Sequence, residues 1–332
     1  MSPTTTASAP CLPRLVVVGP TATGKSALAL DLAEKIQADE PATRAEIINA
    51  DASLLYRGMD IGTAKPSPAE RARVPHHQID VLTVRDRASV AAFQRSARGD
   101  IDAVESRGNL PIIVGGSGLY VRALTDDLDF PGTDPAVRTR LSERAEQEGT
   151  AALHAELARL DPVAAERVEA SNTRRIVRAL EVIEITGRPF SACLPRYEDI
   201  APTVHIALRC ERRLLDLRIN ERARAMFERG LVEEVEALIG QGIREGATAP
   251  RAIGYAQALA VIDGTMSVPE AVDSTALATR QLASRQIKWF RRDPRLHWID
   301  VALTEAGQCT DQERSRVTRQ AWEHVLASHD VA

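Results

Sequence analysis

The sequence predicts an α/β fold in which a parallel sheet is flanked by helices and interrupted by a mostly helical insertion domain. Three observations predict it. Short apolar runs rich in Val and Ile alternate with helical patterns. A glycine-rich loop joins the first of these runs to the first helical pattern. Residues 134–186 are helical in pattern throughout, with Ala, Leu, Arg and Glu dominant. The glycine-rich loop makes the expected core P-loop NTPase-like.

The glycine-rich loop fits the pattern G-x-x-x-x-G-K-[ST] and follows an expected strand, Leu15–Gly19. A helical pattern, Ala27–Ala33, comes directly after it. Inward-pointing backbone N–H groups and the helix N-terminus would favour a polyphosphate there. We expect Lys25 to neutralise phosphate charge and the Ser26 hydroxyl to ligate Mg²⁺. The expected phosphate-binding residues are Gly19, Pro20, Thr21, Ala22, Thr23, Gly24, Lys25 and Ser26.

Three further strands are expected at Glu46–Ala50, Leu110–Gly115 and Val204–Leu208. Asp51 follows the first of these strands, and Gly115-Gly116-Ser117 ends the second. Right-handed crossovers bring the carboxyl ends of parallel strands to one side, where ligands bind. We therefore expect Asp51 and the Gly115–Ser117 segment to meet the glycine-rich loop at one edge of the sheet.

Each of these side chains has alternative roles. Asp51 is a candidate general base or Mg²⁺ ligand, and an ordinary N-cap of the next helix is the simpler interpretation. The Ser117 hydroxyl is a candidate donor to a departing diphosphate oxygen, or part of a tight turn. Gly58, Gly62 and Pro66 interrupt regular structure, which predicts an ordered binding loop between Tyr56 and Pro66.

The helical stretch carries its own boundary signals. Asp134-Pro135 and Asp161-Pro162 each look like an N-cap followed by proline at the first helical position, and Gly187-Arg188-Pro189 ends the block. Two further long helices are expected at Arg212–Ile239 and Ser267–Arg292. The expected organisation is a disordered leader (1–13), a core (14–133 and 200–310), the helical insertion (134–199) and a C-terminal helix or tail (311–332).

Composition excludes several classes of protein. The 332 residues are 44% hydrophobic and 27% charged, as in ordinary globular proteins, and no stretch approaches about 18 apolar residues. The four cysteines are scattered, which argues against a zinc site, and the leader lacks the features of a signal peptide. We expect a cytoplasmic protein with reduced thiols, and a monomer by default.

A net charge of −4 gives no global attraction to nucleic acid, so local basic clusters matter more. Arg174, Arg175 and Arg178 form one cluster, and the segment from Arg280 to Arg295 forms another. Each is either a solvated helix face or a nucleic-acid contact. At their helical spacing, Trp289 and Phe290 are expected in the core rather than stacked on bases.

Taken together, these segments resemble the bacterial tRNA dimethylallyltransferases, also called isopentenyl-diphosphate:tRNA transferases. The resemblance runs from about Leu15 to about Asp300. Its pieces are GPTATGKS, the Asp51–Tyr56 segment with YRGMDIGTAKP, Pro75-His76-His77 as a turn, IIVGGSGLY, RRIVRALEV, RAIGY and TRQLASRQIKW. Two departures are visible: the family often has Asp-Ser where this chain has Asp51-Ala52 with Ser53 one place later, and Gly-Gly-Thr where it has Gly-Gly-Ser.

The resemblance implies transfer of a five-carbon dimethylallyl group from dimethylallyl diphosphate to N6 of the adenine immediately 3′ of the tRNA anticodon. It implies that Asp51 accepts the N6 proton, that Lys25, Ser117 and Mg²⁺ on Ser26 stabilise the departing diphosphate, and that Arg218 and Arg222 reach it. It also implies that the insertion contacts the anticodon stem. The implied tRNA-contacting residues are Asp51, Ala52, Ser53, Leu54, Arg138, Arg174, Arg175, Arg178, Arg251, Arg285 and Lys288.

Three alternatives stay open at this stage. An ATP-dependent small-molecule kinase would use the same loop but leaves YRGMDIGTAKP unexplained. An isopentenyltransferase acting on adenylates would share the loop and Asp51, although the insertion and the late basic segment favour a macromolecular acceptor. A non-catalytic tRNA-binding module would not need Lys25, Ser26 and Asp51 around one pocket.

Overall fold

The computed structural model describes residues 12–193 and 197–329. The chain divides into two compact units, which we call the core unit (Met1–Thr125 with Asp199–Ala332) and the helical unit (Asp126–Glu198). The helical unit therefore begins at Asp126, earlier than the expected boundary at residue 134. Most of the expected leader, including Cys11, lies outside the described residues. Leu12, which the sequence assigned to that leader, packs against the hydrophobic core.

The core unit is built on a six-stranded parallel sheet in the order β3-β2-β4-β1-β5-β6. The strands are β1 (Arg14–Val18), β2 (Ala45–Asn49), β3 (His76–His77), β4 (Leu110–Gly115), β5 (Thr203–Arg209) and β6 (His297–Asp300). All four expected strands are confirmed, and they form the four central positions of the sheet. The two edge strands were not expected. Pro75-His76-His77 was expected as a turn, but His76 and His77 pair with β2 instead.

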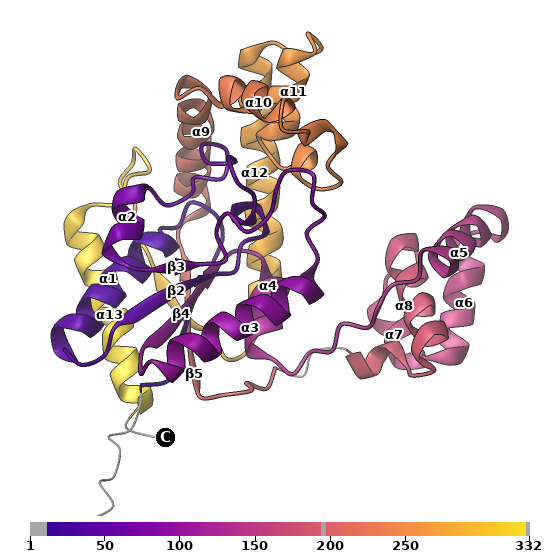
Figure 1. Ribbon diagram of the computed structural model, residues 1–332, viewed down its shortest axis with the longest axis horizontal. Coiled ribbons are helices and arrows are strands. Elements are labelled where there is room, and N and C mark those ends of the chain that lie inside the picture. The colour runs from indigo at the N-terminus through magenta and orange to yellow at the C-terminus, as the bar shows by residue number, and fades with distance from the viewer. Residues whose placement is uncertain (1–11, 194–196, 330–332) are drawn as a thin grey trace, which may run out of the picture. The chain divides into compact units, whose positions relative to one another are not determined.

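Helices cover both faces of this sheet. The α-helices of the core unit are α1 (Lys25–Asp39), α2 (Pro68–Arg73), α3 (Val90–Ser106), α4 (Gly118–Thr125), α9 (Arg212–Glu228), α10 (Leu231–Ile239), α11 (Tyr255–Ile262), α12 (Val268–Phe290) and α13 (Asp311–His329). α1 and α13 pack side by side against the sheet, and α3 and α4 pack against β4 on the opposite face (Figure 1). The expected C-terminal helix is α13.

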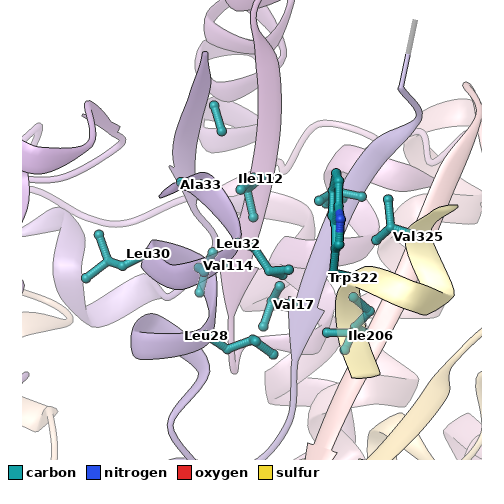
Figure 2. Packing of buried hydrophobic residues seen from close by; sticks show 14 of the residues in the cluster. Val17, Leu28, Leu30, Leu32, Ala33, Ile112, Val114, Ile206, Trp322 and Val325 are labelled. Carbon is teal, nitrogen blue, oxygen red and sulfur yellow. The ribbon is translucent and has the colours of Figure 1, made fainter. Parts of the chain in front are cut away.

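One hydrophobic cluster joins α1 and α13 to the sheet. Figure 2 shows Leu28 and Leu32 of α1 meeting Val17 of β1, with Trp322 and Val325 of α13 beside Ile206 of β5. All six of these residues are 5% exposed or less. Burying such side chains stabilises the fold by roughly 1.5–3 kcal/mol each, so this cluster fixes the central strands from which the site projects.

Two expected helices behave differently. The expected helix Arg212–Ile239 is broken into α9 and α10 at Gly230, whose φ of 93° lies in the left-handed region that favours glycine. The expected helix Ser267–Arg292 is confirmed as α12, which starts with a capping box between Ser267 and Glu270. α9 and α12 pack against each other in the core unit.

The helical unit contains α5 (Pro135–Glu148), α6 (Thr150–Leu160), α7 (Pro162–Arg167) and α8 (Thr173–Thr186). The predicted boundary signals are confirmed. The Asp134 carboxylate accepts a hydrogen bond of 2.8 Å from Ala136 N, Asp161 accepts one from Ala164 N, and α8 ends at Gly187 with a φ of 66°. Buried leucine, isoleucine, valine and alanine side chains from all four helices form the core of this unit.

None of the helices in the described part of the chain is long and apolar enough to cross a membrane.

Candidate active site

The carboxyl ends of the central strands open into a cavity of about 730 Å³ in the core unit. Residues from the glycine-rich loop, from the turn after β2, from α9 and from the loop after β6 line it. They include Thr21, Ala22, Gly24, Lys25, Ser26, Asn49, Asp51, Leu54, Arg218, Arg222, Gly307, Gln308 and Cys309. Its size is within the range of small-molecule sites, and its place in the sheet is where ligands of parallel α/β folds bind. The structure therefore brings Asp51, Lys25, Ser26, Arg218 and Arg222 together.

The glycine-rich loop has the curled backbone that its sequence predicts. Gly24 adopts a φ of 98° at the N-cap of α1, and Ala22 also has a positive φ, of 65°. The loop is held from within, because Thr23 Oγ1 and Lys25 Nζ both donate to the carbonyl of Pro20, at 2.8 and 2.7 Å. Ser26 is exposed at the first turn of α1. The loop thus presents the N-terminus of a fifteen-residue helix to the cavity.

Cations dominate one side of the cavity. The pKa of Lys25 is lowered to about 8, chiefly by burial; the charge of Asp51 opposes this shift and that of Arg222 adds to it. Burial also lowers the pKa of Arg222, with Asp51 opposing that shift and Arg218 adding to it. The Nε atom of Arg222 is buried and has no hydrogen-bond partner among the described residues. Clustering desolvated cations is costly unless an anion joins them.

Asp51 also lines the cavity, and it caps a short 3-10 turn (Ala52–Leu55) that follows β2. Its Oδ1 atom accepts hydrogen bonds from Ser53 N at 3.1 Å and Ser53 Oγ at 2.7 Å. The N-cap interpretation is therefore correct. The carboxylate also lines the cavity, so capping does not remove it from the candidate chemistry.

Ser117 contacts the backbone of this turn. Its Oγ atom accepts a hydrogen bond of 3.3 Å from Ala52 N, and Ser117 is not among the residues that line the cavity. The close approach of strands β2 and β4 explains the neighbouring glycine, because a Cβ at Gly115 would lie 2.2 Å from the carbonyl oxygen of Ala50. Contact between Ser117 and a diphosphate stays a prediction.

A residue that the sequence analysis missed connects two of these segments. Gln286 of α12 is 7% exposed, accepts a hydrogen bond of 2.8 Å from Thr21 N, and donates one of 2.9 Å to the carbonyl of Gly116. One amide side chain thus bridges the glycine-rich loop to the segment after β4. Asn49 was missed too, and it holds the backbone of Asp51 at the end of β2.

The YRGMDIGTAKP segment is ordered by contacts within the core unit. The side chain of Lys65 is 2% exposed, and its Nζ atom donates to Tyr56 O, Asp60 Oδ1 and Asp80 Oδ1. Burial raises the pKa of Asp80, but hydrogen bonds from Lys65 and Arg71 outweigh this effect and hold it below its ordinary value. Lys65 therefore holds the segment together, while Thr63, Ala64 and Pro66 line the cavity.

A wall of the cavity comes from the loop between β6 and α13. Gly307 has a φ of 74°, and a Cβ there would lie 3.1 Å from the carbonyl oxygen of Leu214 on α9. A side chain at this position would strain the backbone and crowd the helix that carries Arg218. Cys309 lines the cavity beside it, and burial raises the pKa of the nearby Cys210 thiol to about 11.

The expected tRNA-contacting residues fall into different environments. Arg251, Arg285 and Lys288 are exposed on the core unit, and Arg174 and Arg175 are exposed on the helical unit. Arg138 and Arg178 instead pair with Glu181, whose side chain is fully buried, at 2.6 and 2.8 Å.

The expectation that Trp289 lies in the core is wrong. Trp289 is 37% exposed, whereas Phe290 is buried at 3%. The Trp289 indole lies against the backbone of Gly118, where a Cβ would come within 2.1 Å of its Nε1 atom.

Comparison with known proteins gives one consistent result. Residues 54–293 match the family model described as IPP transferase. A tRNA dimethylallyltransferase of Streptomyces coelicolor is 54% identical over 313 residues, 94% of this chain and 98% of the relative. Another from Streptomyces avermitilis is 53% identical over 305 residues, 91% of this chain and 96% of the relative.

Solved structures agree with these relatives. The tRNA isopentenylpyrophosphate transferase of Bacillus halodurans superposes with a TM-score of 0.65 at 35% identity, over 96% of this chain and 98% of that one. A eukaryotic dimethylallyltransferase acting on tRNA superposes with a TM-score of 0.76 at 23% identity, over 93% of this chain and 77% of that one, and supports the fold alone.

Proposed function

The chain belongs to the tRNA dimethylallyltransferase (IPP transferase) family, and we propose that it transfers a dimethylallyl group from dimethylallyl diphosphate to N6 of the adenine immediately 3′ of the anticodon. It is a prenyl-transferring enzyme that modifies tRNA. The observation that carries the finer proposal is the cavity that Lys25, Arg218, Arg222 and Asp51 line together. It pairs a site for a departing anion with a site for a proton.

The cationic side of the cavity suits the diphosphate of the donor. Arg222 Nε is a buried donor without a partner in the described chain, and a diphosphate oxygen would satisfy it. Lys25 and the N-terminus of α1 would add charge and backbone N–H groups to the same group. These donors stabilise the negative charge that grows on the diphosphate as its bond to carbon breaks.

The residues present also fit Mg²⁺. Mg²⁺ in such sites is usually held by one or two protein oxygens together with substrate phosphates and water, and the Ser26 hydroxyl is exposed to the cavity. When bound, Mg²⁺ would neutralise part of the diphosphate charge.

We propose that Asp51 acts on the acceptor. The lone pair of adenine N6 is delocalised into the ring, so N6 is a poor nucleophile until its proton is removed. As the bond from N6 to the dimethylallyl carbon forms, the carbon–oxygen bond breaks and its electron pair leaves with the diphosphate. Asp51 accepts the N6 proton in this step.

The adenine must leave its stack to enter such a cavity, at a cost of a few kcal/mol that is smallest in a flexible loop. We propose that Arg251, Arg285 and Lys288 of the core unit contact the tRNA backbone, together with Arg174 and Arg175 of the helical unit. Arg138 and Arg178, which pair with Glu181, would attract tRNA through the electrostatic field of this charged network. Binding would weaken as salt concentration rises. We also propose that the enzyme is a monomer and acts in the cytoplasm, where its tRNA substrate would be found.

One assay separates the proposed function from its alternatives. Purified protein is given labelled dimethylallyl diphosphate with tRNA, with AMP, or with no acceptor. We expect label on tRNA alone. Label on AMP would favour an adenylate isopentenyltransferase, and ATP-dependent phosphoryl transfer without prenyl transfer would favour a kinase.

The Asp51→Asn variant tests the base. Asparagine caps helices as well as aspartate does, so the turn after β2 should persist. We expect a loss of about 10²–10⁴-fold in transfer rate, with tRNA affinity unchanged. Asp86→Asn is the matched control, because Asp86 likewise accepts hydrogen bonds from the backbone and hydroxyl of one nearby residue, Thr83, but does not line the cavity. An Asp51→Asn enzyme that transfers at the normal rate would contradict the assignment.

A further inference from the structure

The turn that carries Asp51 is held by a buried asparagine. Asn49 is 4% exposed and lies at the end of β2. Its Oδ1 atom accepts a hydrogen bond of 2.9 Å from Asp51 N, and its Nδ2 atom donates one of 3.0 Å to Asp51 O. Nδ2 also donates to the carbonyl of Gln78 at 2.8 Å. The backbone of Asp51 is therefore fixed on both sides by one side chain, which is itself anchored to the neighbouring segment.

The two oxygens of the Asp51 carboxylate have different surroundings. Oδ1 accepts hydrogen bonds from both Ser53 N and Ser53 Oγ, at 3.1 and 2.7 Å. Oδ2 faces Gly116, where a Cβ would lie 3.7 Å away, and no donor of the described residues is found on it. Donation to Oδ1 alone leaves the lone pairs of Oδ2 available.

We propose that Asn49 and Ser53 are positioning residues, which commit Oδ1 of Asp51 to the turn and leave Oδ2 to accept the proton of the attacking amine. This inference rests on the proposed function and deepens it. The proton passes from N6 to Oδ2 while the N6–carbon bond forms, and the diphosphate leaves with the electron pair of the broken carbon–oxygen bond. Neither Asn49 nor Ser53 takes part in these bond changes.

The chain has Asp51-Ala52-Ser53 where the family often has Asp-Ser, and the role proposed for Ser53 explains this departure. A serine two positions after an aspartate can direct both its backbone N–H and its hydroxyl to the carboxylate, as Asx-type turns do. Ser53 has this geometry, whereas Ala52 has no hydroxyl and gives its N–H to Ser117 Oγ. The Ser53 hydroxyl donates to Asp51, and the expected contact of Ser53 with tRNA stays a prediction.

Ser53→Ala tests the inference, because the half-buried site tolerates loss of a hydroxyl. Transfer is measured in single turnover, and tRNA affinity is measured separately by filter binding. We expect the transfer rate to fall about 10- to 100-fold, as for loss of a hydrogen bond to a charged group or a small misplacement of a catalytic group. The Kd for tRNA should stay within about twofold, and Ser53→Thr, which keeps the hydroxyl, should restore most of the rate.

Three results would overturn the inference: an unchanged rate in Ser53→Ala, a loss confined to tRNA affinity, or a Ser53→Thr enzyme as slow as Ser53→Ala. Ser106→Ala, on an exposed serine at the end of α3, is the matched control. Asn49→Ala should slow transfer as well, with a melting experiment to check its fold. If the wild-type protein transfers no label to tRNA, the proposed function fails; if it does and Ser53→Ala matches it, only the positioning role fails.

Discussion

Replacing Gln286 with methionine should loosen the glycine-rich loop from outside the cavity. Methionine keeps the length and much of the shape of glutamine but offers no amide. The variant loses the hydrogen bonds from Thr21 N and to Gly116 O, which measure 2.8 and 2.9 Å. Gly116 is buried, so its carbonyl is left unsatisfied at a cost of about 1–3 kcal/mol. Thr21 is half-buried and water can reach its N–H, so its share is about 0.5–1 kcal/mol.

The expected loss in free energy of unfolding is therefore about 1.5–4 kcal/mol, measured by urea denaturation. The matched control is Gln281→Met, five residues earlier on the same helix at an exposed position, which should change stability by less than about 0.5 kcal/mol. We also expect the KM for dimethylallyl diphosphate to rise several-fold in Gln286→Met alone. If the two variants were equally stable and had equal KM values, the bridge would have no energetic role.

The remaining predictions concern ionisable groups. Burial lowers the pKa of Lys25 to about 8, so its charged form dominates only below that pH. We expect kcat/KM for the diphosphate donor to fall as pH rises above 8, and Lys25→Arg, which stays charged, to lack this decline; a persistent decline would assign it to another group. Burial raises the pKa of Glu181, but hydrogen bonds from Arg178 and Arg138 hold it below its ordinary value. The ionised Glu181 therefore stabilises the fold above about pH 4.5, and this stabilisation is lost as pH falls through the lower pKa of the folded state. Glu181→Gln should lower the free energy of unfolding by about 1–3 kcal/mol at pH 7, a range reduced because Arg138 and Arg178 are partly exposed. It should also weaken the loss of stability at acid pH, measured by circular dichroism. An unchanged dependence of stability on acid pH would argue against the network.

The central fold could be predicted from the sequence because its signals are local. Runs such as Leu15–Val18 are apolar throughout, as is typical of parallel strands covered on both faces, and the structure buries all four of these residues. The edge strands could not be found in this way. β3 has only two residues, and in β6 only Ile299 is fully buried, so neither carries a clear apolar pattern.

The residues of the candidate site likewise include some that local sequence signals predict and some that they do not. The glycine-rich loop and Asp51 could be placed because strand ends of a parallel sheet meet at one edge. Gln286 could not, because a glutamine on a helix is usually solvated and its partner Thr21 lies 265 positions away in the sequence. Nor does the arginine-rich pattern in the insertion show that Arg178 is paired to a buried glutamate while Arg174 is exposed.

The hydrogen bond of 2.9 Å from Ile200 N to Thr125 O has an architectural consequence. It joins the residues at which the polypeptide leaves the sheet-based body and re-enters it, so the intervening stretch begins and ends at neighbouring points. Because the entropic cost of closing a loop rises only slowly with its length, we expect this position to accept inserted segments of different lengths. The helical unit is thus exchangeable in principle, and its replacement by a tight turn would leave the core unit with its cavity.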